Sequence, residues 1–283
     1  MPGTVITKSF SFKILPIAIA ILLLLPNFFT VELSPLTPYN GKEKFDPTLA
    51  RINSIKILEE YTDSIASSKQ IKAQSFEYVE LLESVIEQRF YHGFSHFTTS
   101  ENWMAAVAGR FIKEDYACKV QPEKIMQHPN AACSQQALVM MAVLRNKKIS
   151  YRSLGLPHHY AMEVLIDNEW YFCDANMEPG ISKEKRKLSS WKHQTDLLKE
   201  NYDTNRYPNL DYQFGKNQMV SVGEINEIPA RKATFFHAAT GVLSKIAWLF
   251  PLAFALFNLR LKAKRPLLCF SFARRKPSLS LSA

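Results

Sequence analysis

Two apolar stretches, one near each end of the chain, limit what this sequence can fold into more than any other feature. The first covers residues 14–29 and has no charged residue, and the second covers residues 241–259 with one charge, Lys245. A helix with no polar face must bury its whole surface, either in a protein core or in lipid. We therefore predict two transmembrane helices, at residues 14–30 and 241–259.

Each stretch also has an alternative interpretation. The first would span only about 24 Å as a helix and contains Pro16 and Pro26, so a cleaved signal peptide competes with an uncleaved signal anchor. We favour the anchor because no Ala-x-Ala-like cleavage site follows. The second stretch has Lys245 and Trp248 near its start, as expected at a membrane interface. Its alternative is a basic amphipathic helix lying on the membrane.

The distribution of charge predicts the orientation of the chain. All 26 acidic residues lie between Val31 and His237, with 25 of the 35 Lys and Arg residues, so this part is nearly neutral. The net charge of +9 therefore comes from the flanks of the apolar stretches, which argues against nucleic-acid binding. Because positive flanks face the cytoplasm, we expect both termini inside and the intervening domain outside, on a periplasmic or cell-surface face.

These features give a predicted domain organisation. It consists of a cytoplasmic tail (1–13), a signal anchor (14–30), a linker (31–47), an extracytoplasmic domain (48–237, core about 95–180), a transmembrane helix (241–259) and a basic cytoplasmic tail (260–283).

Helical patterns come first in the outer domain. Asp46-Pro47 offers a helix N-cap followed by proline at the first helical position. Apolar residues then recur at helical spacing over 52–65 and 76–86. We expect the acidic side of the second helix to be solvated; it comprises Glu77, Glu80, Glu83 and Glu87.

A buried helix and a β-hairpin follow. Residues 137–144 are apolar all round, which is typical of a central, buried helix. Strands are predicted at 151–156, 159–166 and 169–174, and the last two are joined by a turn at Asp167-Asn168. The order of elements predicts an α+β domain. Residues 180–215 are polar and rich in turn formers, and we interpret them as a surface excursion that is a candidate lid.

Three residues in this region form a candidate catalytic triad. Cys133 stands at the expected N-terminus of the buried helix, where the helix dipole favours a thiolate. In a hairpin turning at residues 167–168, residue i pairs with about residue 335 minus i, so Asp174 lies diagonally near His159. A carboxylate there orients the imidazole, which activates the Cys133 thiol and protonates the leaving group.

These segments resemble the transglutaminase-like superfamily, the circularly permuted relatives of papain-like thiol enzymes. The matching segments are Ala-Ala-Cys133-Ser-Gln-Gln, His159-Tyr-Ala-Met-Glu163-Val and Glu-Trp-Tyr-Phe-Cys-Asp174. The chain departs from the family pattern in having Ala132 before the cysteine, His159-Tyr160-Ala161 and Asp174-Ala175-Asn176. The resemblance implies an α+β core and a thiol enzyme acting on amide bonds of a protein or peptide, as a peptidase or amidase more than a transglutaminase.

Further site residues are less constrained. The Cys133 backbone N–H is one candidate oxyanion donor. The resemblance offers Gln127 and Trp103 as counterparts of the donors used in the family, and a structural role is the alternative for each. Glu163 lies on the same strand face as His159. Its role is either that of a further partner supporting His159 or that of an ordinary cross-strand contact. We expect no cofactor and no metal. A Cys118–Cys173 disulfide and a zinc site of Cys118, Cys133, His159 and Cys173 are alternatives for the remaining thiols.

A second functional class stays open beside the enzyme. The same fold, with two anchors and a divergent motif, is compatible with an inactive interaction module that binds partner proteins of an envelope or polysaccharide assembly. A Cys133 locked in a disulfide, or a cleft blocked by residues 180–215, would favour this second hypothesis.

Overall fold

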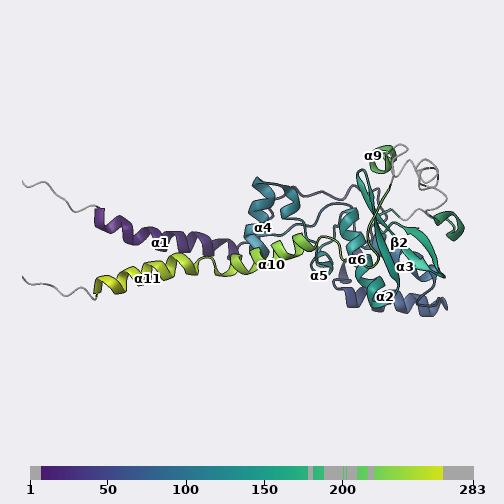
Figure 1. Cartoon of the computed structure of the whole chain (residues 1–283), viewed down its shortest axis with the longest axis horizontal. Helices are drawn as coiled ribbons and strands as arrows, with labels where there is room; N and C mark the ends of the chain where they lie inside the picture. Colours follow the sequence, from purple (N-terminus) through teal and green to yellow (C-terminus); the bar gives the residue numbers. More distant parts are fainter. Residues whose placement is uncertain are drawn as a thin grey trace, which may run out of the picture. The chain divides into compact units, whose positions relative to one another are not determined.

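The computed structural model describes residues 8–177, 181–187, 200, 202, 209–215 and 220–263, and of this part only the backbone is described for residues 8–13, 259 and 261–263. Contacts between residues divide the chain into two compact units. One unit consists of Met1–Leu25 together with Lys245–Ala283, and the other consists of Pro26–Ser244. The described helices that precede the sheet (Figure 1) are α1 (Lys8–Leu24), α2 (Ile55–Ser68), α3 (Phe76–Arg89), α4 (Thr99–Phe111), α5 (Pro122–Ile125) and α6 (Cys133–Asn146), with short 3-10 turns η1 (Leu25–Phe28), η2 (Pro47–Arg51) and η3 (Glu114–Tyr116).

Local sequence signals explain where the first helices of the larger unit begin. The Asp46 carboxylate accepts a hydrogen bond from the Thr48 backbone N–H and Pro47 opens η2, as the Asp-Pro signal predicts. Ser54 and Ser75 cap α2 and α3 in the same way. These caps fix the first residues of the two helices, whose apolar sides pack on α6.

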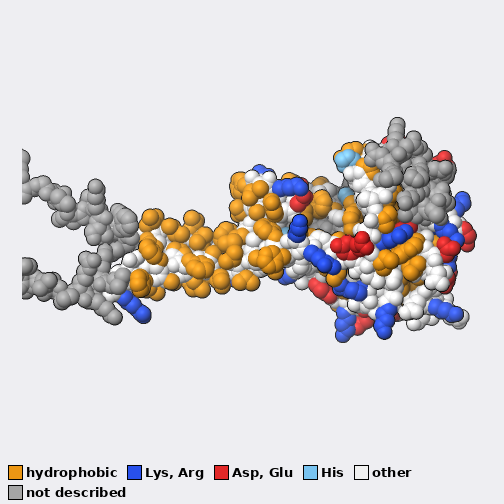
Figure 2. Space-filling model, viewed as in Figure 1, with side chains coloured by type: hydrophobic (Ala, Val, Ile, Leu, Met, Phe, Trp, Pro, Cys, Tyr) orange, Lys and Arg blue, Asp and Glu red, His pale blue; other side chains and the backbone are white. Residues whose placement is uncertain are grey.

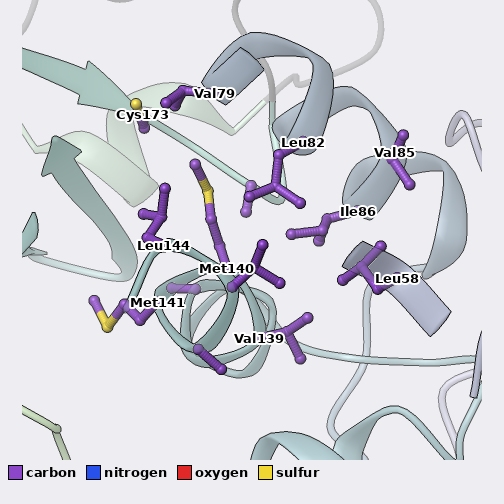
Figure 3. Packing of buried hydrophobic residues seen from close by; sticks show 14 of the residues in the cluster. Leu58, Val79, Leu82, Val85, Ile86, Val139, Met140, Met141, Leu144 and Cys173 are labelled. Atoms are coloured by element: carbon purple, nitrogen blue, oxygen red, sulfur yellow. The ribbon is translucent and has the colours of Figure 1, made fainter. Parts of the chain in front are cut away.

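Helix α6 is the centre of the main hydrophobic core. Residues 135–144 are all buried, which confirms the prediction of a central helix with no polar face. Figure 3 shows Val139, Met140 and Leu144 of α6 among side chains of α2 and α3 such as Leu58 and Leu82. The rigid packing of this helix fixes the position of its first residue, Cys133.

An antiparallel sheet of order β3-β2-β1-β4 lies against this core, so the fold is α+β as predicted. Its strands are β1 (Ser150–Leu156), β2 (His159–Ile166), β3 (Glu169–Cys173) and the short β4 (Ser221–Val222). Asp167 and Asn168 both have positive φ, as a two-residue hairpin turn requires. The pairs Ile166–Glu169 and Met162–Cys173 confirm the predicted register.

Both faces of the sheet are buried. One face contributes Met162 and Val164 to the core around α6. The other contributes Ala161 and Phe172 to a second cluster, which includes Tyr202, Leu210 and Phe214 from the polar excursion. The described parts of this excursion, among them η4 (Lys183–Arg186) and α9 (Leu210–Phe214), therefore cover the sheet. The remaining residues of the predicted candidate lid lie outside the described residues.

The acidic side of α3 is less exposed to solvent than the sequence predicts. Glu83 and Glu87 are buried, and Glu83 is bound by the Arg186 guanidinium at 2.9 Å. Arg186, which belongs to η4, is itself buried and also donates to Glu80 at 3.2 Å. Glu77 is exposed as predicted, but the prediction was wrong for Glu83, because its charged partner lies about a hundred residues away and helical periodicity cannot reveal it.

The C-terminal apolar stretch also differs from the prediction. Residues 241–259 form part of two helices, α10 (Arg231–Ile246) and α11 (Leu249–Ala263), with a turn at residues 247–248. Pro251 has no N–H to donate to the Ala247 carbonyl, so a continuous helix would lack that bond. Within the described residues no single helix is both long and apolar enough to cross a membrane, and only the bent pair Arg231–Ile246 with Leu249–Asn258 reaches that length and composition together.

Within the smaller unit, α1 and α11 lie side by side and antiparallel (Figure 1). The small residues Ala20 and Ala255 are buried, whereas most large apolar side chains of the two helices are exposed, including Leu22, Phe250 and Phe257. Figure 2 shows hydrophobic side chains over much of the visible surface of this pair.

The Glu83–Arg186 pair gives a prediction for stability. Glu83→Gln removes the fully buried carboxylate that pairs with the buried Arg186 charge and should lower the free energy of unfolding by about 3–5 kcal/mol. Glu80→Gln removes a half-exposed partner of the same arginine and should cost less than about 1 kcal/mol. Chemical denaturation of the two variants checks this, and equal effects would contradict it.

Candidate active site

Cys133 occupies the first position of α6, immediately after the N-cap residue Ala132. Its side chain is a free thiol and is partly exposed, whereas the helix that carries it is buried from residue 135 onward. The N-terminal end of a helix presents backbone N–H groups and favours negative charge. The position therefore suits a nucleophilic sulfur and the oxyanion that its attack creates.

His159 and Asp174 form a buried ion pair beside this helix end. Nε2 of His159 lies 2.7 Å from Oδ2 of Asp174, and both side chains are almost fully buried. His159 opens β2 and Asp174 directly follows β3, so the confirmed register brings the two together diagonally across the hairpin. The structure thus brings together the predicted base and its orienting carboxylate.

The Asp174 carboxylate is held by four hydrogen bonds. Besides His159, Oδ2 accepts a bond from the Tyr202 hydroxyl at 3.1 Å. Oδ1 accepts the backbone N–H groups of Asn176 and Met177 at 3.1 and 3.0 Å. The Asp174 backbone N–H in turn donates to Glu83. A buried charge needs such partners, and here they fix the direction in which the carboxylate points.

These contacts set the charge state of His159. Burial acts to lower the pKa of its imidazole, but the charge and hydrogen bond of Asp174 outweigh it, and with Cys133 they raise the pKa to about 10. The imidazole is therefore an imidazolium at neutral pH.

The Cys133 thiol acts on the same ring, since its interactions with His159 are among the causes that raise the pKa of the imidazole. Because Nε2 faces Asp174, Nδ1 is the nitrogen left to face the thiol. The structure therefore brings Cys133, His159 and Asp174 together, with the imidazole ring interacting with both the sulfur and the carboxylate. An imidazolium beside a sulfur favours its thiolate form, and the same ring can later give its proton to a leaving group.

The other predicted site residues have different surroundings. The Trp103 indole N–H donates to the Ser244 carbonyl at 2.9 Å, and the Glu163 carboxylate pairs with Arg152 at 2.6 Å. Gln127 is exposed in the turn after α5, and no described contact joins it to the triad. Of the proposed oxyanion groups, the Cys133 backbone N–H is therefore the one that the described structure places at the sulfur.

Several residues of the site were not identified from sequence. Phe214 lies 5.3 Å from the His159 ring, measured between ring centroids, and Tyr202 packs on Phe214 at the same distance. Gln136 donates to Asn176, which also contacts His92. The only sequence signal for Tyr202 and Phe214 is that they are aromatic residues within a polar excursion.

The other two described cysteines do not form a disulfide bond. Cys118 and Cys173 are both free and buried, so the pairing considered for them is absent among the described cysteines. Within the described residues no three His, Cys, Asp or Glu side chains are grouped so that they could hold a metal ion.

Comparison of the chain with known proteins identifies no matching family model, no matching curated protein and no matching solved structure.

The raised pKa of His159 predicts a pH dependence of stability. The charged imidazole stabilises the folded state fully below its unfolded pKa of about 6.5, and this contribution is lost as pH rises towards 10. The difference in unfolding free energy between the native chain and His159→Gln should therefore shrink between about pH 6.5 and pH 10. Denaturant titrations across this range measure it, and a constant difference would refute the assignment.

Proposed function

We propose that this chain is a thiol enzyme with a transglutaminase-like core that acts on amide bonds of a protein or peptide. The observation that carries the proposal is the linkage of the free Cys133 thiol, through the His159 ring, to the buried Asp174 carboxylate. These are the groups that covalent catalysis by a thiol requires, in the order nucleophile, base and orienting group.

The proposed reaction proceeds through an acyl-enzyme. The Cys133 thiolate attacks the amide carbonyl carbon and forms a C–S bond, while the Cys133 backbone N–H faces the resulting oxyanion. The tetrahedral intermediate then collapses, the C–N bond breaks, and the amine leaves with the proton of the His159 imidazolium. Water, deprotonated by the now neutral His159, cleaves the thioester and releases the acid. Hydrolysis is favoured over transfer to an amine, and the chain is therefore proposed to be a peptidase or amidase.

Two features support an active enzyme over an inactive interaction module. Cys133 is a free thiol and stays partly exposed. Phe214 and Tyr202 of the excursion contact His159 and Asp174 and shield this ion pair from water, while Cys133 stays partly exposed, so these two residues do not close over the thiol. Lower water access strengthens the electrostatic interaction between these two groups.

We further propose that the enzyme is anchored in a membrane with its catalytic domain on the extracytoplasmic side. The support is the exposed apolar surface of α1 and α11 together with the positive flanks of both stretches. The antiparallel arrangement of α1 and α11 is compatible with both termini lying on the cytoplasmic side.

The role of Cys133 can be tested with a biotinylated acyloxymethyl ketone, which alkylates activated cysteine thiols with loss of its carboxylate group. Cys133→Ala should abolish labelling, and His159→Ala should lower its rate by at least about a hundredfold. Cys118→Ala and Cys173→Ala are matched controls, since both remove a free thiol, and each should label normally. Undiminished labelling of Cys133→Ala would exclude Cys133 as the nucleophile.

The membrane proposal predicts the behaviour of the chain in cells. The intact chain should remain in the membrane fraction after alkaline carbonate washing, because two apolar helices are held by lipid. An externally added protease should remove residues 48–237 while epitope tags at both termini stay protected. Release by carbonate, or digestion of either tag, would contradict the proposed topology.

A further inference from the structure

An apolar cavity of about 240 Å³ lies next to the candidate triad. Its apolar wall is contributed by Phe94, Val120, Leu138, Tyr160, Pro229 and Ala230. These residues come from separated parts of the chain, and no residue of the mechanism above lines the cavity. It is therefore a second feature of the site that needs its own explanation.

Two residues that line the cavity are chain neighbours of the reacting groups. Ser134, which directly follows Cys133, and Tyr160, which directly follows His159, both line it. The pKa of Tyr160 is raised mainly by burial, and the charges of Glu227 and Cys133 add to the effect, so the phenol lies within electrostatic reach of the Cys133 sulfur. Ser134 and Tyr160 therefore place the cavity beside the end of α6 that carries Cys133, on the face of β2 opposite to the His159 side chain.

The size and lining select the kind of group that fits. A dry cavity of about 150 Å³ lined by apolar side chains binds benzene, so 240 Å³ accommodates one large apolar side chain. Lys119 also borders the cavity, but its buried ammonium is paired with Glu101 at 2.9 Å. A charged substrate group would therefore lose its hydration without gaining a free counter-ion.

One wall of the cavity is anchored to the sheet by the segment before α10. The Asn226 backbone N–H donates to the Tyr151 carbonyl at 2.8 Å, and the Tyr151 N–H donates to the Asn226 side chain at 3.0 Å. Ala230 is held in a left-handed conformation with φ of 61°. A wall fixed in this way can discriminate between side chains of different size.

We propose that this cavity is the specificity pocket of the enzyme and that it receives one large apolar side chain, of the size of leucine or phenylalanine, from the acyl side of the scissile amide bond. This inference rests on the proposed function, since it assigns the substrate class of the same site. It identifies the substrate as an apolar peptide segment.

The test uses acyloxymethyl ketone probes and the full-length protein in detergent. In one probe series Gly, Ala, Asp, Leu or Phe bears the reactive ketone, and in a second series the same residues precede a glycine that bears it. The rate at which Cys133 is labelled is measured by mass spectrometry. In one of the two series the Leu and Phe probes should react at least about tenfold faster than the Gly and Asp probes.

Two variants at one wall position sharpen the test. Val120→Phe fills the cavity and should remove the advantage of the Leu and Phe probes, while Val120→Ala enlarges it and should shift preference from Leu towards Phe. Val107→Phe makes the same change at a position of α4 that does not line the cavity, and its preference should be that of the native chain.

The outcomes separate the pocket from the proposed function. Equal labelling by all probes in both series, with Cys133 still dependent on His159, would overturn the pocket and leave the thiol enzyme intact. Labelling that does not require His159 would overturn the enzyme itself. An apolar preference that Val120→Ala leaves unchanged would also overturn the assignment to this cavity.

Discussion

The buried Asp174 carboxylate is the group on which the arrangement of the site depends. A buried negative charge is stable only where hydrogen bonds and an opposite charge surround it. Asp174 has all of these, with two backbone N–H groups, the Tyr202 hydroxyl and the His159 imidazolium around its oxygens. Because these partners come from β2, the end of β3 and the excursion, satisfying one charge fixes three parts of the chain.

The same requirement links the site to the surrounding fold. Glu83 of α3 accepts the backbone N–H of Asp174 and binds the buried Arg186. Helix α3 packs with α6, whose first residue is Cys133. Cys133 and Asp174 are therefore each attached to the same helical layer, Cys133 by the apolar packing of α6 and Asp174 by buried polar contacts.

Sequence patterns predicted those parts of the site that are local in the chain. The apolar run after Cys133 identified the buried helix, and the turn at Asp167-Asn168 fixed the register that places Asp174 beside His159. Contacts between residues that are far apart in the sequence were not predictable. Glu83 has the same spacing as its exposed neighbours, and Tyr202 lies in a segment with no periodic pattern. The break before α11 follows from Pro251, whose effect the apolar composition of the stretch concealed.

The most direct test is the rate at which iodoacetamide alkylates Cys133, measured by peptide mass spectrometry from about pH 5 to pH 9 in the native chain and in Asp174→Asn. An imidazolium held by Asp174 keeps the neighbouring sulfur reactive at low pH. The native chain should therefore react faster than the variant at the acidic end of this range, and the two rates should converge as pH rises towards 9. The same steep rise in both proteins would contradict the triad.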